Sequence, residues 1–396
     1  MKILFTVNSY EPLHDGVQFV TKYLAEGLVS KGHSVDLITC YHPEATDRRE
    51  ENINGVHVIR WDASTHYTKH IGNRKGYIKY VLNNLNTYDC MINVGTQTPF
   101  LDWLLPVINQ VDMPKILYVH SIWDFKYHKE NFQSAESILK KVWNNVRWKL
   151  YYKKWGDAFK KYNRVIQLHE KDYSSTFFYD RYGIKSVIVE NAADNSFFDD
   201  FQNSTISLPK KYIINVSNYD DRKNQMKMLS SFLLANTPAD FEMILIGSTR
   251  NSYCEKVIET YQEYLKSNPN GKKVHILYDI PREQISTYVK NASLYIMASK
   301  WEAFPISLTE SMAASVPWIS TDVGIVKYLP GGVISDEKQN LAYWIGVLTN
   351  NRSKAETLGS VGNAFAKEHF RISKKVDQVE KCIFDAINDY KRRKKQ

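Results

Sequence analysis

The chain has 396 residues, more than one ordinary hydrophobic core accommodates, so two domains are predicted. Hydrophobic residues make up 43% and charged residues 24%, a globular composition that excludes a disordered chain. The net charge of +9 predicts an acidic partner: a nucleic acid, an anionic membrane or a phosphorylated substrate. Because the chain has no zinc-finger spacing, aromatic RNA-binding motif or basic heptad region, nucleic acid is not an expected partner.

The N-terminal segment Met1–Val7 has too short an apolar run for a signal peptide and predicts a buried strand instead. No stretch reaches 18 uninterrupted apolar residues, so no membrane-spanning helix is predicted. The four cysteines are far apart and form no paired metal-binding spacing. We therefore expect a reduced, cytoplasmic protein.

Short apolar runs alternate with helical segments along the chain, which predicts parallel sheets joined by crossovers. In the first helix, Val17, Val20, Leu24 and Leu28 form one apolar face, and Gly32 ends it. The first series of strands is predicted at Lys2–Asn8, Ser34–Cys40, Val56–Trp61, Asp89–Val94, Lys115–His120, Arg164–Leu168 and Ser186–Glu190.

A polar segment that ends in proline, Asp199–Pro209, predicts a linker to a second domain. We expect an α/β fold with two doubly wound domains over residues 1–200 and 201–372, then a helix and basic tail over residues 373–396, the tail frayed. The second series of strands is predicted at Tyr212–Val216, Phe241–Gly247, Val274–Tyr278, Leu294–Ala298 and Val316–Ser320.

Two segments of the first half carry candidate residues. The loop Ser9–Val17 follows the first strand, at the sheet edge where open α/β folds bind ligands. Gly16 in this loop permits close backbone approach to a donor phosphate or to an acceptor, although a plain helix-start glycine is the alternative. His120 ends an apolar strand, and a lone histidine there is more often structural than catalytic.

The segment Leu139–Arg164 is rich in basic and aromatic residues and predicts a helix. Its apolar positions suggest a buried stripe with lysines on the opposite face. One interpretation is a surface helix packed on the first domain. The other is docking on an anionic membrane surface. The buried stripe would contain Leu139, Val142, Val146, Leu150 and Trp155.

Two loops of the second half combine charge with a strand end. Arg222 and Lys223 follow the strand Tyr212–Val216, a position that favours a functional role. The alternative is that they lie in a solvated loop without function. Glu302 and Glu310 flank the start of a helix expected from Ile306 to about Ser315. Pro305 suits its first position, and Phe304 before it has no oxygen to cap the free amides. A phosphate can supply the missing partner, because a helix N-terminus offers donors and positive potential.

The second of these loops resembles the Glu-x7-Glu signature of retaining glycosyltransferases with the GT-B fold, family 4 in particular. This resemblance implies two Rossmann-like domains facing across a cleft, with the acceptor side in the first domain and the nucleotide-sugar site in the second. It also implies that the final helix crosses back onto the first domain. The matching residues are Glu302, Phe304, Pro305, Glu310, Ala313 and Pro317.

The resemblance assigns donor roles in the second domain. Glu302 would contact the donor sugar, and its charge would favour a positive anomeric carbon. Glu310 would bind the ribose hydroxyls. Lys223 matches the lysine of the phosphate loop, but Asn218 replaces the usual arginine, which leaves Arg222 as a substitute. The resemblance also implies that backbone amides near Phe304 to Ser307 hold the diphosphate, so that Phe304, Pro305, Ile306 and Ser307 form part of the donor site. It further implies base contacts at Gly247, Tyr278 and Ile280.

In the first domain, the resemblance places His120 near the sugar 6-hydroxyl and the reaction centre. Of two glycines usual after the first strand, this chain keeps only Gly16, preceded by Asp15. Asp124 is an acceptor-side candidate, as are His14 and Asp15.

The function implied is retaining transfer of a sugar from a nucleotide diphosphate to a saccharide or lipid-linked saccharide, in surface polysaccharide or glycolipid synthesis. No acid is clearly placed as a nucleophile. We therefore expect a same-face substitution in which the leaving phosphate takes the acceptor's proton, with no metal or cofactor. The expected location is cytoplasmic or peripheral on the inner face of the plasma membrane. A nucleotide-sugar epimerase and a membrane-recruited, nucleotide-sugar-binding scaffold remain alternatives.

Overall fold

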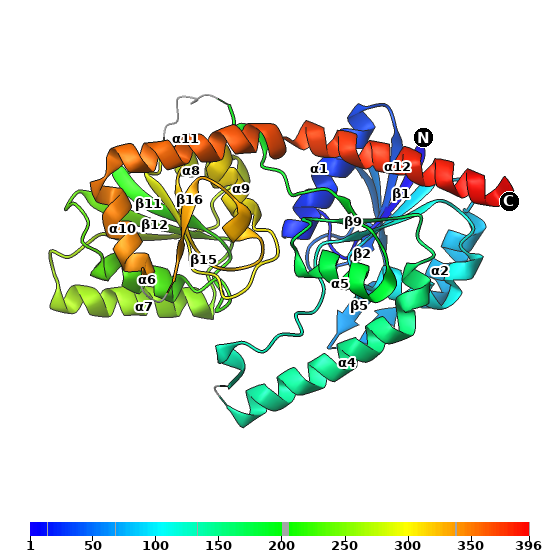
Figure 1. Cartoon of the computed structure of the whole chain (residues 1–396), viewed down its shortest axis with the longest axis horizontal. Coiled ribbons are helices and arrows are strands. Elements are labelled where there is room, and N and C mark those ends of the chain that lie inside the picture. Colours follow the sequence, from blue (N-terminus) through cyan, green and yellow to red (C-terminus); the bar gives the residue numbers. More distant parts are fainter. Residues whose placement is uncertain (14, 68, 133, 200–205, 337–338, 396) are drawn as a thin grey trace. The chain divides into compact units, whose positions relative to one another are not determined.

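The computed structural model describes residues 1–13, 15–67, 69–132, 134–199, 206–336 and 339–395 (Figure 1). It divides into two compact units. Unit 1 contains Met1–Val189 and Lys375–Gln396, and unit 2 contains Glu190–Lys374. The first division falls between Val189 and Glu190, before the boundary predicted between residues 200 and 201, so the segment Glu190–Asp199 belongs to unit 2. Within the described residues, no helix is both long and apolar enough to cross a membrane.

Unit 1 contains an eight-stranded sheet in the order β10-β9-β8-β7-β1-β2-β4-β3. All neighbouring strands pair in parallel except β3 and β4, which are antiparallel. A separate hairpin pairs β5 with β6. The strands are β1 Lys2–Thr6, β2 Ser34–Cys40, β3 Glu50–Ile53, β4 Val56–Trp61, β5 Ala63–His66, β6 Lys69–Gly72, β7 Cys90–Val94, β8 Lys115–Val119, β9 Arg164–Gln167 and β10 Val187–Ile188.

Helices cover this sheet, and one of its cores packs against α2, α3, α4 and α5. The central strands β1, β7 and β8 are almost continuously apolar and buried, as parallel strands covered on both faces must be. The helices are α1 Gly16–Ser30, α2 Arg74–Asn83, α3 Pro99–Leu104, α4 Ala135–Phe159, α5 Tyr173–Tyr182 and α12 Ile372–Lys395, with short 3-10 turns at Leu105–Gln110 and Lys129–Phe132.

The C-terminal helix α12 packs on α1 within unit 1 (Figure 1). A Cβ added at Gly27 of α1 would lie 2.3 Å from Val376 Cγ2, so only glycine allows this approach. Lys31, the C-cap of α1, also pairs with Asp377 at 2.6 Å and with Glu380. The helix continues to Lys395, so the prediction of a frayed tail from Lys391 is wrong.

Unit 2 contains a parallel six-stranded sheet in the order β13-β12-β11-β14-β15-β16. One of its cores packs against α6, α7 and α10. The strands are β11 Lys211–Val216, β12 Phe241–Gly247, β13 Val274–Tyr278, β14 Leu294–Met297, β15 Trp318–Thr321 and β16 Gly332–Ser335. The helices are α6 Gln225–Leu234, α7 Ser252–Ser267, α8 Arg282–Lys290, α9 Ile306–Ala313, α10 Leu341–Asn350 and α11 Arg352–His369, with 3-10 turns at Asn195–Phe197 and Val326–Tyr328.

The predicted α/β class with two parallel-sheet domains is confirmed. Each predicted strand overlaps an observed one, and four strands were missed: β3, β5, β6 and β16. The prediction for α4 was wrong about its orientation, since Leu139, Val142, Val146 and Leu150 are exposed. The face of α4 turned to the core carries Lys141, Asn145, Tyr152, Gly156 and Phe159 instead.

Candidate functional site

The candidate donor residues of unit 2 follow adjacent strands. The strand order reverses at β11, which has β12 on one side and β14 on the other. In open parallel sheets, ligands bind at the carboxyl ends of the strands where the order reverses. Lys223 lies in the loop after β11, and Glu302 lies in the loop after β14. The two loops therefore meet at the position where this kind of fold binds a ligand.

The centre of this site is the carboxylate of Glu302, which is 8% exposed. Lys223 Nζ donates to its Oε1 at 2.6 Å, and Arg222 lies 3.2 Å from the same oxygen. The loops are also joined by their backbones, because the amide of Lys300 donates to the carbonyl of Arg222 at 2.8 Å. Two cations thus share one carboxylate, so an incoming anion can recruit one of them while the other still balances the charge of Glu302.

Helix α9 begins beside this charged cluster. The helix begins at Ile306, as predicted, but Pro305 is its N-cap rather than its first helical residue, and no side chain caps the helix. The amides of Leu308 and Thr309 donate to the Pro305 carbonyl at 3.2 and 3.4 Å. The half-buried Ile306 and Ser307 form the start of the first turn. An uncapped helix start near two cations suits a phosphate. Phe304 is buried, and its carbonyl accepts from Asn191 Nδ2 at 2.8 Å.

The second carboxylate, Glu310, is buried inside α9 and forms an ion pair with Arg282, the first residue of α8. Burial raises the pKa of Glu310, and the nearby guanidinium of Arg282 opposes this shift. The Arg282 side chain is 48% exposed and lies over the ring of Phe197, 5.6 Å from its centroid. Glu310 can therefore accept hydrogen bonds as a carboxylate only while a cation remains beside it.

The residues predicted to contact the base are each held by different neighbours. A Cβ at Gly247 would lie 2.1 Å from the ring of Tyr219, so packing alone requires glycine there. The Tyr219 hydroxyl is fixed by the carbonyl of Leu245 at 2.9 Å. Tyr278 ends β13 and accepts from Arg250 NH1 at 3.2 Å, and Ile280 follows it in a half-buried position. All three predicted residues lie at the carboxyl ends of β12 and β13.

The replacement of the expected arginine by Asn218 leaves an exposed amide side chain in the loop after β11. The backbone carbonyl of Asn218 accepts from Gln225 Nε2 at 2.8 Å. Arg222, four residues later, reaches Glu302 instead. The structure thus provides a second cation in this loop beside Lys223, at another position in the sequence.

In unit 1, the loop after β1 ends in a helix N-cap. Asp15 is the N-cap of α1 and accepts from the amide of Gln18 at 2.9 Å, while the Ser9 hydroxyl donates to its other oxygen. Gly16 is the exposed first residue of the helix. His14 lies outside the described residues. Asp15 therefore has a helix-capping role that sequence reasoning did not identify.

His120 follows β8 and is 8% exposed. Its ring stacks on Tyr118 at 4.5 Å between centroids, and among the described residues Nε2 has no hydrogen-bond partner. Burial lowers the pKa of His120 to about 4, so the imidazole is neutral at neutral pH. Asp124 accepts from the amide of Lys126 at 2.9 Å and pairs with His128, so it shapes its own turn.

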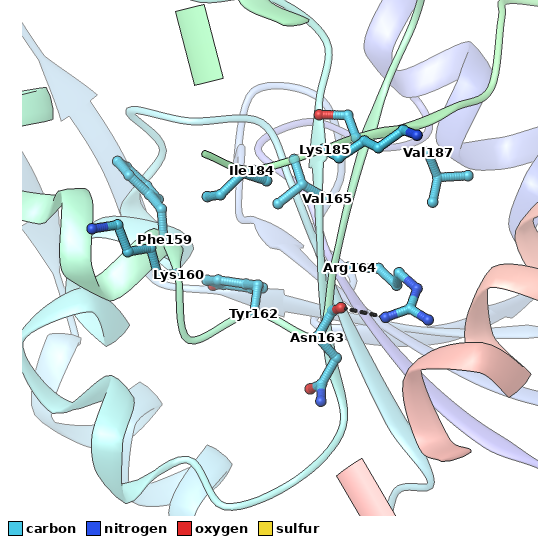
Figure 2. A pocket seen from close by; sticks show the side chains of 10 residues that line it. Phe159, Lys160, Tyr162, Asn163, Arg164, Val165, Ile184, Lys185 and Val187 are labelled. Carbon is cyan, nitrogen blue, oxygen red and sulfur yellow. Dashed lines mark hydrogen bonds between the residues drawn. The ribbon is translucent and has the colours of Figure 1, made fainter. Parts of the chain in front are cut away.

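A pocket of unit 1 lies at the amino end of β9 (Figure 2). It contains none of the candidate residues. Arg164 donates there to the carbonyl of Asn163 at 2.8 Å and pairs with Asp389 of α12. This pocket is therefore at the opposite edge of the sheet from the loops that carry His120 and Gly16. Within the described ranges, no group of three His, Cys, Asp or Glu side chains is arranged to hold a metal ion.

Sequence reasoning missed two residues of the unit 2 site. Arg282 was not singled out, although it follows β13 at the ligand-binding edge of the sheet, which is the signal that could have found it. Gly324 has φ of +53°, and a Cβ there would lie 2.3 Å from the carbonyl oxygen of Ala303. The loop after β15 thus supports the turn that carries Glu302, a contact between distant segments.

Two doubly wound parallel-sheet units, the second with a basic loop and an uncapped helix at its strand-order reversal, define a GT-B-type fold. The chain belongs to glycosyltransferase family 4. The family model Glycosyltransferase Family 4 matches residues 14–167, and the model Glycosyl transferases group 1 matches residues 196–340. Together the two matches cover more than half of the chain. The family inferred from the Glu-x7-Glu segment is therefore confirmed.

Solved structures share this fold at low sequence identity. A glycosyltransferase from Rickettsia africae has a TM-score of 0.69 at 14% identity, over 98% of both chains. A sucrose-phosphate synthase from Thermosynechococcus elongatus has a TM-score of 0.67 at 16% identity, over 97% of this chain and 99% of that one. The Anabaena protein HepE, solved with UDP and glucose, has a TM-score of 0.64 at 16% identity, with the same coverage.

A curated relative is the N-acetyl-alpha-D-glucosaminyl L-malate synthase of Bacillus anthracis, which is 24% identical over 192 residues. The match covers 47% of this chain and 48% of the relative. The chain therefore spans about half the length of the curated relative that it matches.

Proposed function

We propose that this protein transfers a sugar from a nucleotide-diphosphate donor to a saccharide or lipid-linked saccharide acceptor, with retention of anomeric configuration, in surface polysaccharide or glycolipid synthesis. The observation that carries the proposal is the cluster of Lys223 and Arg222 on Glu302, beside the uncapped start of α9. The family membership and the UDP and glucose bound to the related HepE fold support a nucleotide-sugar donor.

Each group in the site has a proposed role. Arg222, Lys223 and the first amides of α9 stabilise the charge that develops on the departing diphosphate. Glu302, released from Lys223 as the donor binds, contacts the sugar and favours the positive charge at the anomeric carbon. Glu310 accepts hydrogen bonds from the ribose hydroxyls. The leaving phosphate accepts the proton of the acceptor, so that one bond to the anomeric carbon breaks and the new one forms on the same face.

His120 contributes as a neutral imidazole, which can accept or donate one hydrogen bond to the donor sugar. A cationic histidine would oppose the positive charge at the anomeric carbon, and burial prevents that form at neutral pH. Because two side-chain cations and a helix start meet the diphosphate, we propose that transfer requires no metal ion. Full activity after EDTA treatment is the expected result, and restoration by Mg²⁺ of activity lost to EDTA would refute this point.

The test of the function mixes purified protein with UDP-, GDP- and ADP-sugars, with and without a lipid-linked saccharide. Nucleotide release only in the presence of acceptor, with the product's anomeric configuration matching the donor by NMR, is expected. Release with water and a free epimer as product would show an epimerase. Donor binding without turnover of any donor would show a scaffold.

The matched variants are Glu302→Gln and Glu242→Gln. Glu302→Gln keeps the shape of the side chain and should lower kcat at least about 100-fold, since it removes charge that acts in the transition state. Glu242 lies on β12 in the same unit and pairs with His275 at 2.6 Å, away from the site, so its variant should transfer normally. Near-normal turnover by Glu302→Gln would contradict the proposed mechanism.

A further inference from the structure

Helix α4 of unit 1 has an apolar stripe on its outer face. Leu139 is 68% exposed, Trp143 67% and Leu150 61%, with Val142 and Val146 between them. These positions are separated by three or four residues, so they lie on one side of the helix. The opposite face is already used, because Tyr152 and Phe159 are completely buried against the domain core. The outer stripe therefore contributes nothing to packing within its own unit.

Cations flank this stripe on both sides. At 100° per residue, Lys140 and Arg147 lie along one edge, and Lys149 and Lys153 lie along the other. In the described part of the chain, none of these four side chains forms an ion pair. The only acidic residues of α4 are Glu136 and Asp157, near its ends. Arg147 lies over the ring of Trp148, 4.0 Å from its centroid, and feels the charge of Asp102. The middle of the helix thus presents apolar side chains between two rows of cations.

Aromatic side chains extend the apolar surface beyond the helix start. Phe132, three residues before α4, is 60% exposed, and its ring lies 6.1 Å from that of Tyr127, which is 47% exposed. The helix is also firmly held on its inner side. Tyr151 donates to Asp102 of α3 at 2.6 Å, and Lys141 Nζ donates to the carbonyl of Asp124 at 2.5 Å.

We propose that this face of α4 binds the surface of an anionic lipid bilayer. An apolar stripe containing Trp and Leu with Lys and Arg on its flanks is the pattern that inserts at the boundary between headgroups and acyl chains. The cations would each interact with anionic headgroups near the surface. A second copy of this chain is a poorer occupant, because pairing two such faces would bring four rows of cations together with few acids to offset them.

The proposal extends the proposed function, since it would bring a transferase to lipid-linked acceptors, but binding itself does not depend on transfer. Vesicle binding and sugar transfer are therefore measured in separate assays. Variants of the stripe should keep the transfer rate to a soluble saccharide acceptor. If no transfer is found with any donor while vesicle binding persists, the proposed function is refuted and the proposed membrane-binding face of α4 is still supported.

The experiment uses the full chain and vesicles of phosphatidylcholine with or without 30% phosphatidylglycerol, taken as roughly the anionic content that gives a strong surface potential. Binding only to the anionic vesicles, weakened by added salt, is expected. The double variant Trp143→Ala/Leu150→Ala should bind at least about 10-fold more weakly. Lys149→Gln/Lys153→Gln should lose most of the preference for anionic vesicles.

Matched controls alter exposed residues of the same kinds in unit 2. Leu234→Ala, at an 82% exposed position, and Lys256→Gln/Lys266→Gln on α7 should bind vesicles as the natural chain does. Brominated lipid should quench part of the fluorescence, and Trp143→Phe should lose that quenched part while still binding. Failure of the natural chain to bind anionic vesicles, unchanged binding in both α4 double variants, or a dimer abolished by Trp143→Ala/Leu150→Ala would each overturn the proposal.

Discussion

At the scale of single residues, the site joins charged groups that are far apart in the sequence. Lys223 and Glu302 are 79 positions apart, yet their charged atoms are 2.6 Å apart. Arg282 and Glu310 form a second pair in the same unit. Each pair places a cation on a buried carboxylate, which balances the charge of that carboxylate where little water reaches it.

The stability of the protein should depend on His120 between pH 7 and pH 5. Its pKa is about 4 in the folded chain against about 6.5 in an unfolded one, so the unfolded chain takes up a proton first as the pH falls. This protonation should remove about 2 kcal/mol of unfolding free energy by pH 5. Urea denaturation at the two pH values should show that His120→Gln has the smaller pH dependence. An identical pH dependence would show that His120 titrates normally.

Arg222 should supply the cation that Asn218 cannot. Arg222→Gln removes a charge-assisted contact worth about 1.5–3 kcal/mol and should weaken binding of nucleoside diphosphate by roughly 10- to 100-fold. The double variant Asn218→Arg/Arg222→Gln restores a cation to the loop and should recover part of that affinity. Isothermal titration calorimetry measures both. If Arg222→Gln binds normally, Arg222 does not contact the diphosphate.

Arg282 should control the protonation of Glu310. Without the guanidinium, the burial that already raises the pKa of Glu310 acts unopposed, so the carboxylate protonates at higher pH. Nucleotide affinity of Arg282→Gln should therefore rise from pH 6 to pH 8 more steeply than that of the natural chain, while Arg282→Lys should behave almost normally. Titrations at both pH values, with Arg282→Gln/Glu310→Gln as a variant that cannot titrate, test this. Parallel pH profiles would exclude the coupling.

At the scale of elements, the accuracy of the sequence predictions depends on how each element is buried. Strands buried on both faces, such as β2 and β12, were placed correctly because most of their side chains are apolar and must be excluded from water. The edge strand β3 and the hairpin strands β5 and β6 are polar and largely exposed, so they have no such signal. For α4, periodicity alone favoured the face that the structure exposes, because the buried face begins with Lys141 and Asn145 and is apolar only from Tyr152 onward.

The contact between α1 and α12 gives a prediction at this scale. Gly27→Ala would place a methyl group against Val376, an overpacking that costs about 1–3 kcal/mol and outweighs the helix propensity gained. Adding Val376→Ala should make room, so the two changes should be non-additive by at least about 1 kcal/mol. Chemical denaturation of the natural chain, both single variants and the double variant measures this coupling. Simple additivity would mean that α12 relaxes away from α1.

At the scale of the whole molecule, the chain is two units with separate cores. The residues predicted to bind the base, the ribose and most of the diphosphate lie in unit 2, and Gly16 is the predicted donor-binding residue of unit 1. A nucleoside diphosphate at 100 times its Kd stabilises the native state by about 2.7 kcal/mol, which should raise the melting temperature of unit 2 by about 5–10 °C. Differential scanning calorimetry with UDP, GDP and ADP measures the shift and identifies the base. Inorganic phosphate at equal ionic strength is the control. An unchanged thermogram with all three nucleotides would contradict nucleotide binding by unit 2.

The sequence by itself determined the α/β class, the positions of the buried strands and the family. Apolar runs and the segment from Glu302 to Glu310 are patterns of residues that are neighbours in the chain, so they can be recognised without the structure. The tertiary structure decided which charges meet. It paired Arg282 with Glu310, brought Arg222 to Glu302 in place of an arginine at Asn218, and turned Trp143 of α4 outward. These outcomes depend on strand order and on competition between helix faces, which no local pattern records.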